Sequence, residues 1–499
     1  MTDAAPGAER AYLKRYPDVA GAIEAGTITS AREHFLNYGR FEGRAWPGPS
    51  AGPAAIPPAS AFPAVPHHCD AILLSQGFLF VEGWIDDRFD QLAGIALGSS
   101  GDQPSLAAMP HRCRREDVER HLAFSSPFEA GFWQLFEIPS EIAVHPIALR
   151  LDLASGESIS VPPANPVRLP VREHLDAFLG FYGRRSLIGN LVARSFAELD
   201  AGLGSMIARM HGAARATYRA SSDGHYGSRP AKPLLSFVCC LYGIPDFLFL
   251  QIARFAHHAS LERFEFIYVN NTPALEEVLH RDAELAAMLF ETSVRVISFD
   301  QNTGFSYANN IGVARARART VVLINPDVFP REAASLAALV RLASGKAKHA
   351  ITGGKLFYAD GTVMHEGMAF VPDPRLSALA RSPVWTVEHP RKGFPDRGER
   401  KTRRVPAVSG AMMALDRADF ERIGGFDEHF LYGHYEDADL CLRFAEQGTE
   451  QGWKVLCDPA LAFWHYEGCG SIRRPEHEGA LPINRWRFSC KWRDVLSGR

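Results

Sequence analysis

The second half of the chain alternates short apolar runs with amphipathic segments. The apolar runs cover residues 235–241, 264–269, 294–299 and 320–324. Near-continuous apolar runs of this length are typical of parallel strands buried on both faces. Residues 336–343 carry apolar side chains at helical spacing, and Gly345 then provides a helix stop. This series predicts an α/β domain with a Rossmann-like mixed, mainly parallel sheet, whose ligands bind beyond the carboxyl ends of the strands.

A different pattern occupies residues 67–171. Leu149, Leu151 and Leu153 alternate with charged residues, as in a strand that has one buried face. Further strand candidates, separated by turn residues, are residues 77–84, 92–97 and 131–138. We therefore expect a β-sandwich accessory domain in this part of the chain.

The remaining segments connect or extend these two domains. Residues 1–46 have the spacing of short helices and predict a small helical module. Residues 47–66 are rich in Pro, Ala, Gly and Ser without charge, which is typical of a linker, and residues 172–232 predict a helical connector. The C-terminal tail 481–499 mixes basic and aromatic side chains, so it either packs on the preceding domain or touches anionic lipid.

Composition narrows the class of protein. At 499 residues the chain is longer than a single hydrophobic core usually supports, so several domains are expected. Its shares of 46% hydrophobic and 22% charged residues are ordinary for a soluble protein. A net charge of −3 argues against a nucleic-acid partner, and no apolar stretch is long enough to span a membrane. None of the eight cysteines forms a C-x-x-C pair. A reducing, cytoplasmic location is favoured, with contact at the inner face of the plasma membrane left open.

A carboxylate follows the apolar run that ends at Ile324. The segment Asn325-Pro326-Asp327 comes directly after this run, where ligands reach an α/β sheet. A hard oxygen ligand at such a position can hold Mg²⁺ or Mn²⁺ against a diphosphate. The same three residues are also typical of a simple turn, so this segment alone does not decide between the two interpretations.

Polar residues also follow the run that ends at Phe299. Gly304 permits a tight turn, and the helix that comes next presents free N–H groups to an anion. Asn302, Asn309 and Asn310 are placed to hydrogen-bond a nucleotide or a sugar. An ordinary capped helix would show the same pattern, and both interpretations stay open on these residues alone.

Acidic residues begin a predicted helix at Glu436. Asp439 and Arg443 are four residues apart and are expected to pair, which leaves Glu436 and Asp437 free to face a substrate. Acidic residues that only cap the helix would give the same pattern. His465 follows another predicted strand and precedes a Gly-rich loop, from which a neutral imidazole can ligate a metal, although a lone His is more often structural.

The ordered set of these motifs closely resembles the family 2 glycosyltransferases, particularly their rhamnosyltransferase-like branch. The likeness covers roughly Leu234 to Ser471 and includes the Asn-x-Gly segment, Asn-Pro-Asp, the Glu-Asp-x-Asp helix and the late His. Segments around Tyr16 and Tyr38 resemble a small module often attached to bacterial glycosyltransferases. The resemblance implies an inverting catalytic domain of the glycosyltransferase-A fold over residues 233–480, acting in surface polysaccharide or other glycan synthesis.

The resemblance also implies individual roles. Asp437 matches the family's catalytic base, with Glu436 beside it. Asp327 stands where the family's metal-binding Asp-x-Asp ends, and Asn325 takes the place of the first acid, a form that many members of this branch share. His465 matches a position that completes the metal site in some relatives. A divalent cation, Mn²⁺ or Mg²⁺, is therefore the implied cofactor.

Several residues match positions that bind the nucleotide-sugar donor. They are Tyr242, Asn270, Asn302, Gly304, Asn309, Asn310, Asn325, Ser409 and Gly410. The family usually has Asp where Asn270 stands, to accept from a uracil-type N–H. An amide accepts without charge, which leaves open a nucleotide other than UDP or a weakened pocket.

The predicted activity is transfer of a sugar to a hydroxyl of a glycan, a lipid-linked molecule or a protein. A catalytically weakened nucleotide-sugar or glycan-binding protein is the alternative, suggested by Asn270 and Asn325. A nucleotidyltransferase would need a Gly-rich basic loop after the first strand, and residues 242–245 lack one. The basic segment 391–404 is either a lid or clamp over substrate or a solvated surface loop.

Overall fold

The computed structural model describes residues 6–24, 30–34, 65–88, 91–99, 106–122, 128–139, 147–186, 191–345, 349–448 and 452–498. The chain divides into two compact units. Unit 1 comprises residues 1–185 and 205–210, and unit 2 comprises residues 186–204 and 211–499. Most of the expected linker 47–66, and the segment around Tyr38, lie outside the described residues.

Unit 1 begins with three short helices. They are α1 (Pro6–Arg15), α2 (Pro17–Glu24) and α3 (Ala31–His34). Tyr12, Val19 and Ala31, one from each helix, form a small buried core. The Tyr12 hydroxyl lies 3.2 Å from His34 Nδ1 and joins α1 to α3.

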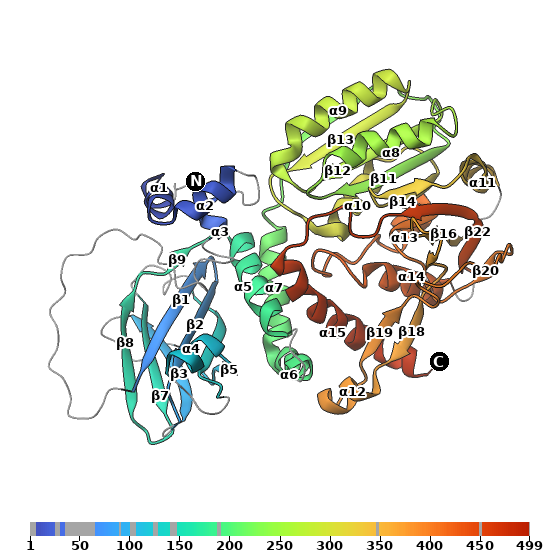
Figure 1. Cartoon of the computed structure of the whole chain (residues 1–499). Helices are drawn as coiled ribbons and strands as arrows, with labels where there is room; N and C mark the ends of the chain where they lie inside the picture. Colours follow the sequence, from blue (N-terminus) through green and yellow to red (C-terminus); the bar gives the residue numbers. More distant parts are fainter. Residues whose placement is uncertain are drawn as a thin grey trace. The chain divides into compact units, whose positions relative to one another are not determined.

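Two sheets follow in unit 1 (Figure 1), with the orders β5-β6-β2-β1-β9 and β4-β3-β7-β8. Their elements are β1 (His67–Ser75), β2 (Phe78–Ile85), β3 (Leu92–Ser99), β4 (Leu106–Ala108), β5 (His111–Cys113), α4 (Glu116–His121), β6 (Gly131–Glu137), β7 (Ile147–Leu153), β8 (Ser158–Ala164) and β9 (Val167–Arg168). Residues of both sheets, such as Leu79 and Leu149, share one apolar core. Helix α5 (Val171–Ser186) covers the other face of the first sheet, where the rings of Phe80 and Phe178 are 5.5 Å apart.

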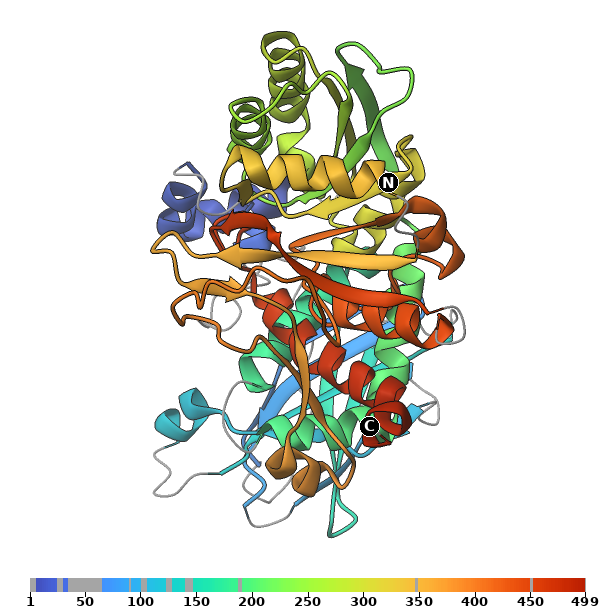
Figure 2. The same ribbon diagram turned by 90° about the vertical axis from the view of Figure 1, so that its right-hand side faces the viewer.

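Unit 2 is built on one large sheet, whose main path has the order β10-β13-β12-β11-β14-β21-β16-β22-β15. Its strands are β10 (Ala220–Tyr226), β11 (Leu235–Leu241), β12 (Phe264–Asn270), β13 (Ser293–Phe299), β14 (Thr320–Ile324), β15 (Val328–Pro330), β16 (Ala350–Phe357), β17 (Val363–His365), β20 (Arg403–Arg404), β21 (Met412–Asp416) and β22 (Lys454–His465), with β18 (Ala369–Pro372) and β19 (Trp385–Glu388) as a separate hairpin. Its helices are α6 (Leu191–Glu198), α8 (Asp246–Ala256), α9 (Glu276–Leu289), α10 (Gly304–Arg315), α11 (Ala333–Ser344), α12 (Pro374–Ala380), α13 (Arg417–Arg422), α14 (Glu436–Gln447) and α15 (Pro475–Ser497). The residues of α7 (Gly204–Arg215) are divided between the two units. Helix α11 packs on β22 and β15, and Figure 2 shows it in gold across the sheet.

Parallel pairing occurs in two parts of this sheet. Strands β13, β12, β11 and β14 form a parallel block. The sheet has four parallel and six antiparallel pairings, ten in all. Outside this block β16 also pairs parallel with β22, and the other pairings are antiparallel. The sheet is therefore mixed, as expected, but parallel pairings are not the majority. Buried apolar runs do not reveal strand direction, and antiparallel neighbours need no crossover helix that would mark them in the sequence.

Strand β10 lies inside the segment 172–232 that was expected to be a helical connector. It pairs antiparallel with β13 at the edge of the unit 2 sheet. Its sequence, ASSDGHY, contains no apolar run, because an edge strand of this sheet has few fully covered residues. The sheet of unit 2 therefore begins before Pro233, where the α/β domain was predicted to start.

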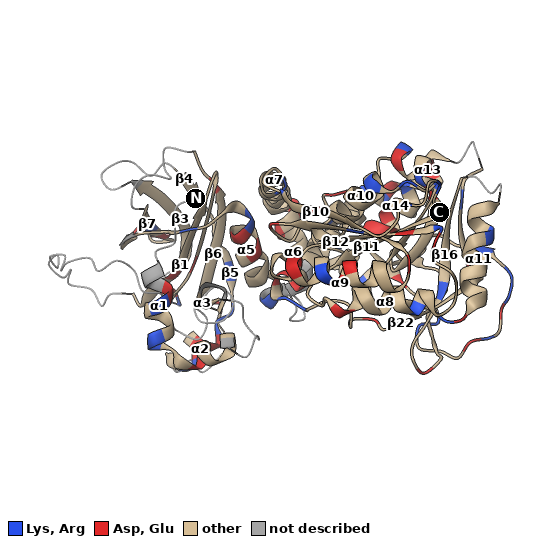
Figure 3. Cartoon of the chain, turned by 90° about the horizontal axis from the view of Figure 1, so that it is seen from above, with Lys and Arg blue, Asp and Glu red and all other residues tan. Residues whose placement is uncertain are grey.

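The C-terminal tail 481–499 forms most of helix α15. Phe488, Trp492 and Leu496 are buried along one face of this helix in the core of unit 2, which agrees with the packed alternative. Lys491 Nζ lies 2.9 Å from an oxygen of Asp427, so a basic group of the tail is paired within the unit. Basic and acidic side chains are also interspersed along α9 and α13 (Figure 3). Among the described residues, no helix combines the length and apolar character needed to cross a membrane.

Candidate active site

The carboxyl end of β14 is joined to the start of α14 by hydrogen bonds. Asn325 N–H donates to the carbonyl of Ala411 at 2.9 Å, which fixes the end of β14 beside the segment that precedes β21. Gly410, the preceding residue of that segment, donates its N–H to Asp437 Oδ2 at 2.9 Å. The structure therefore brings the Asn-Pro-Asp segment, the Ser409–Gly410 segment and Asp437 into one neighbourhood.

Asp327 and His465 face each other across a strand pair. Asp327 directly precedes β15, His465 ends β22, and these strands pair antiparallel with Val328 opposite His465. Asp327 Oδ1 lies 3.4 Å from His465 Nε2, and the other carboxylate oxygen accepts the N–H of Gly470 at 2.9 Å. Both side chains are about 95% buried or more, with 3% of Asp327 and 5% of His465 exposed. The pairing of β15 with β22 brings together two residues that are distant in the sequence.

This pair suits a cation that also binds a diphosphate. Among the residues that the structure describes, no group of three or more His, Cys, Asp or Glu side chains could enclose a metal ion. Mg²⁺ in proteins is commonly bound by only one or two carboxylates, with water and substrate phosphates as the other ligands. His465 Nδ1 contacts Met364 Sδ at 3.4 Å, which holds Nε2 toward Asp327. The donor set therefore fits a divalent cation whose coordination the substrate completes.

A strained turn precedes α14 and aims its first residues. Tyr432, His434 and Tyr435 have φ angles of 55°, 77° and 74°. The left-handed region is uncommon for residues other than glycine, and such strain is often found at functional sites. Asp437, in the first turn of the helix, remains partly exposed although Gly410 donates to one of its oxygens.

Glu436 has a very different environment from that of its neighbour. It is 5% exposed, and its Oε2 atom has no hydrogen-bond partner among the described residues. Burial raises the pKa of this carboxyl well above its ordinary value, and the charge of Asp437 raises the pKa further. The raised pKa favours the protonated form of Glu436, which cannot accept a proton. Asp437, which is partly exposed, is therefore the better candidate base of this pair.

The residues around this helix start are held in place by internal bonds. Arg443 Nε donates to Asp439 at 2.7 Å, as the i, i+4 spacing predicts, and the same guanidinium donates to the carbonyls of Ile423 and Gly425. The amide of Asn310 bonds the backbone N–H and carbonyl of Phe426, at 2.9 and 3.0 Å. Asn310 thus supports the loop after α13 in this structure, and its expected role in binding the nucleotide sugar stays a prediction.

The start of α10 adjoins the strained turn. Asn302 Oδ1 accepts the N–H of Gly304 at 2.9 Å and shapes the turn that begins the helix. Gly304 has φ +80°, and a Cβ atom there would lie 3.3 Å from Tyr432 Cα. Phe305 N–H donates to the Tyr432 carbonyl at 2.6 Å. Gly304 is therefore needed both for the turn and for the close approach of the two loops.

The other side chains predicted to bind the nucleotide sugar include two buried amides and one tyrosine. Asn270 has no exposed surface; it donates to Ser298 Oγ at 3.2 Å and accepts the N–H of Thr272 at 2.9 Å. Asn309 donates to the Phe305 carbonyl, while its Oδ1 has no partner among the described residues. Tyr242 is half-buried and pairs through its backbone with Ser471. Tyr242 is the most accessible of the three.

Two histidines near the site were not singled out from the sequence. His365, at the end of β17, is fully buried, and its Nδ1 lies 3.0 Å from Nδ1 of His389, just after β19. His365 Nε2 accepts the N–H groups of Gly367 and Ser409, at 3.2 and 3.3 Å. No spacing rule connects two histidines on different short strands, so the sequence held no signal for this pair.

The basic segment 391–404 is tied to the body of unit 2 by ion pairs. Lys355 is 2% exposed and lies 3.1 Å from Glu366 and 2.5 Å from Asp396. Lys392 Nζ lies 2.7 Å from Glu467, two residues after His465. The segment is thus connected to the Asp327 neighbourhood, and its expected role as a lid or clamp stays a prediction.

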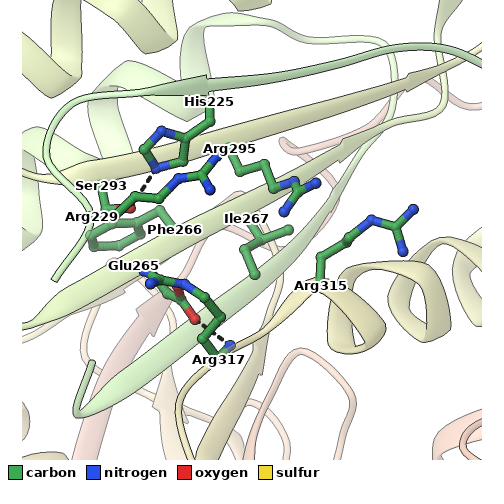
Figure 4. Close-up of a pocket in the computed structure, with 9 residues that line it drawn as sticks. All are labelled: His225, Arg229, Glu265, Phe266, Ile267, Ser293, Arg295, Arg315 and Arg317. Atoms are coloured by element: carbon green, nitrogen blue, oxygen red, sulfur yellow. Dashed lines mark hydrogen bonds and ion pairs between the residues drawn. The ribbon is translucent and has the colours of Figure 1, made fainter. Parts of the chain in front are cut away.

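A separate basic pocket lies at the opposite end of the strands (Figure 4). Its lining residues are His225, Arg229, Glu265, Phe266, Ile267, Ser293, Arg295, Arg315 and Arg317. Glu265 and Ser293 stand at the amino ends of β12 and β13, whereas the candidate site adjoins the carboxyl ends. Arg317 pairs with Glu265 at 3.0 Å and Arg295 with Asp223 at 2.6 Å, so much of this positive charge is internally balanced.

A comparison with protein families identifies the α/β domain. The family model described as "Glycosyltransferase like family 2" matches residues 233–486, about half of the chain. The chain belongs to this family, and the matched segment is its glycosyltransferase domain. The match includes Asp327, Glu436, Asp437 and His465 within its bounds.

Two curated proteins are similar over the same part of the chain. The uncharacterized protein y4gI of Sinorhizobium fredii is 27% identical over 261 residues, which cover 51% of this chain and 26% of that protein. The O-antigen biosynthesis protein RfbC of Myxococcus xanthus is 25% identical over 235 residues, which cover 47% of this chain and 17% of that protein. The chain therefore matches about a quarter or less of the length of these relatives.

Solved structures show only a distant likeness. GalNAc-T7 with UDP, GalNAc and Mn²⁺ has a TM-score of 0.37 at 14% identity, covering 52% of this chain and 50% of that chain. The mannosyltransferase PcManGT from Pyrobaculum calidifontis with GDP-Man and Mn²⁺ has a TM-score of 0.32 at 13% identity, covering 60% and 81%. At this distance the likeness says nothing about the donor or the metal of this chain.

Proposed function

We propose that unit 2 transfers a sugar from a nucleotide-sugar donor to an acceptor hydroxyl, with inversion at the anomeric carbon and with help from Mn²⁺ or Mg²⁺. The observation that carries this proposal is the division of roles at the start of α14. Burial raises the pKa of the Glu436 carboxyl, while Asp437 is partly exposed and oriented by Gly410. Two neighbouring carboxyl groups in different environments are a common arrangement in acid–base catalysis.

The residues of the chain account for the main steps. Asp437 accepts the proton of the acceptor hydroxyl while that oxygen attacks the anomeric carbon, and the nucleoside diphosphate leaves from the opposite side. Asp327 and His465 would hold the cation, which supplies positive charge to the departing diphosphate. The N-terminus of α10, shaped by Asn302 and Gly304, presents N–H groups suited to the same anion.

Asp437→Asn tests the base. Asn keeps the shape of the side chain and an oxygen for the Gly410 N–H, so the fold should persist. Sugar transfer, measured by release of the nucleoside diphosphate across a panel of nucleotide sugars and acceptors, should fall by a factor of about 10²–10⁴. Donor affinity should stay within about twofold because no donor contact is removed. Asp494→Asn, an exposed position on α15, serves as the control. Equal turnover in wild type and Asp437→Asn would exclude Asp437 as the base.

Asp327→Asn tests the cation site. Titration calorimetry of the donor with and without Mn²⁺ should show a metal-dependent gain in affinity for the wild type and none for the variant. The catalytically weakened binding protein, suggested by Asn270 and Asn325, would bind donor but neither transfer nor hydrolyse its sugar. Because RfbC carries the description O-antigen biosynthesis protein, we propose a surface glycan as the product.

A further inference from the structure

The hydrogen bonds around His365 fix the position of its proton. The Nε2 atom of this ring accepts two backbone N–H groups, those of Gly367 and Ser409. A nitrogen that accepts from an N–H donor carries its lone pair there and no hydrogen. The single hydrogen of the neutral ring is therefore on Nδ1, which points at His389 with a nitrogen-to-nitrogen distance of 3.0 Å.

The same contact fixes the proton of His389. Its Nδ1 atom accepts from His365, so the hydrogen of the neutral ring must be on Nε2. A second proton on His389 would place two N–H groups against each other, which disfavours the cation. Burial likewise lowers the pKa of His389. The ring therefore presents an uncharged N–H donor at its Nε2 end.

The His389 ring is linked to the candidate base through His365 and the Ser409–Gly410 segment. His389 is half-buried, and the described residues provide no hydrogen-bond partner for its Nε2 atom. The electrostatic neighbours of the ring are Asp437, Lys392, Glu467 and His465. An uncharged donor at this position binds an oxygen atom without adding a positive charge that would weaken Asp437 as a base.

We propose that His389 donates a hydrogen bond from Nε2 to a hydroxyl oxygen of a carbohydrate acceptor, and that His365 is the residue that positions it. This inference rests on the proposed function, in which Asp437 deprotonates the acceptor. His365 also acts on Asp437 through the backbone. Its Nε2 atom holds Ser409 N–H, and the next N–H, of Gly410, holds Asp437 Oδ2. One buried ring thus aligns both groups that would meet the acceptor.

Three substitutions of His389 distinguish the effect of its N–H group from the effect of the size of its ring. In His389→Gln the amide reaches the place of Nε2 and can still donate, whereas in His389→Asn it reaches only the place of Nδ1, and His389→Ala has no donor. A hydrogen bond to a neutral hydroxyl is worth about 0.5–1.5 kcal/mol, so Asn and Ala should lower kcat/KM for the acceptor roughly threefold to tenfold. In His389→Gln, kcat/KM for the acceptor should stay within about twofold of the wild-type value. The KM for the nucleotide sugar should change in none of the three variants.

The outcomes distinguish this inference from the proposed function. Transfer that is lost in Asp437→Asn but equal in all three His389 variants overturns the inference and leaves the function standing. A change in donor KM instead of acceptor KM also overturns it. Absence of transfer by the wild type over the whole panel refutes the proposed function, and the inference with it.

A second measurement needs no turnover. Nitrogen NMR of the full chain labelled with ¹⁵N-histidine reports which ring nitrogen carries hydrogen, and the single variants His365→Gln and His389→Gln assign the two signals. At neutral pH we expect hydrogen on Nδ1 of His365 and on Nε2 of His389. A hydrogen on Nδ1 of His389 would overturn the inference whatever the kinetics show.

Discussion

Replacing Glu436 with Gln tests the protonation state of the buried carboxyl that begins α14. In the folded protein, burial and then the charge of Asp437 hold the pKa of this carboxyl well above its ordinary value. In the unfolded chain the same group ionises near its ordinary pKa of about 4.3. Between these two pKa values the folded state binds one more proton than the unfolded state.

The sign of the resulting pH dependence follows from that difference. The stability that depends on the protonated carboxyl is fully present below the unfolded-state pKa and is lost as pH rises toward the folded-state pKa. Within this interval the wild type loses about 1.4 kcal/mol of unfolding free energy per pH unit. Gln cannot ionise and does not show this loss. Raising the pH above the unfolded-state pKa should therefore favour Glu436→Gln over the wild type, by up to about 1.4 kcal/mol for each pH unit below the folded-state pKa.

Differential scanning calorimetry at several pH values measures this difference. Calorimetry suits the chain because its two units can melt in separate transitions, and only the transition of unit 2 should respond. Glu262→Gln, on an exposed loop before β12, is the matched control and should show no pH-dependent advantage. The reasoning fails if the melting temperatures of Glu436→Gln and wild type differ by the same amount at every pH, because Glu436 would then be ionised in the folded protein.

Two further predictions concern the surroundings of the site. In Gly470→Ala, the new Cβ would lie 2.8 Å from Asp327 Cγ, so the loop must move. We expect a tenfold or greater loss of Mn²⁺-dependent affinity for the nucleotide sugar, measured by calorimetry, since an overpacked contact costs roughly 1–3 kcal/mol. Unchanged affinity would show that this loop does not shape the cation site. In Lys355→Met, Glu366 and Asp396 lose a shared partner, while Glu366 keeps Arg391 at 3.2 Å, so the loss of stability should stay below the cost of a buried charge without any partner, about 3–5 kcal/mol. The segment 391–404 should then be cut faster by trypsin, and an unchanged cleavage rate would show that Lys355 does not anchor it.

The apolar runs were the part of the sequence that predicted the strands of unit 2 best. The runs 235–241 and 320–324 coincide with β11 and β14, because a strand covered on both faces must be apolar throughout. Strand β10 escaped notice because an edge strand has no such requirement. The antiparallel pairings of β21 with β14 and β16 depend on long-range contacts, and no local pattern encodes the direction of β21.

In the candidate site too, the sequence indicated the residues that belong to motifs but not the contacts that depend on folding. Motif order marked Asp327, Glu436, Asp437 and His465 without showing what surrounds them. The sequence could not reveal that the N–H of Gly470 donates a hydrogen bond to one oxygen of Asp327, because this contact depends on how the loop after β22 folds back. It also could not separate Glu436 from Asp437, since their burial depends on how α14 packs.

The connection between β22 and α15 has a practical consequence for anyone shortening this protein. Gly470 touches the acid proposed to hold the cation, Ser471 and Ile472 lie along Tyr242 and Gly243, and the terminal helix starts at Pro475. Cutting away α15 to obtain a smaller enzyme would release the segment that lies along Tyr242 and Gly243 after β11. A minimal version should therefore extend through Leu496, the last residue that this helix buries in the core.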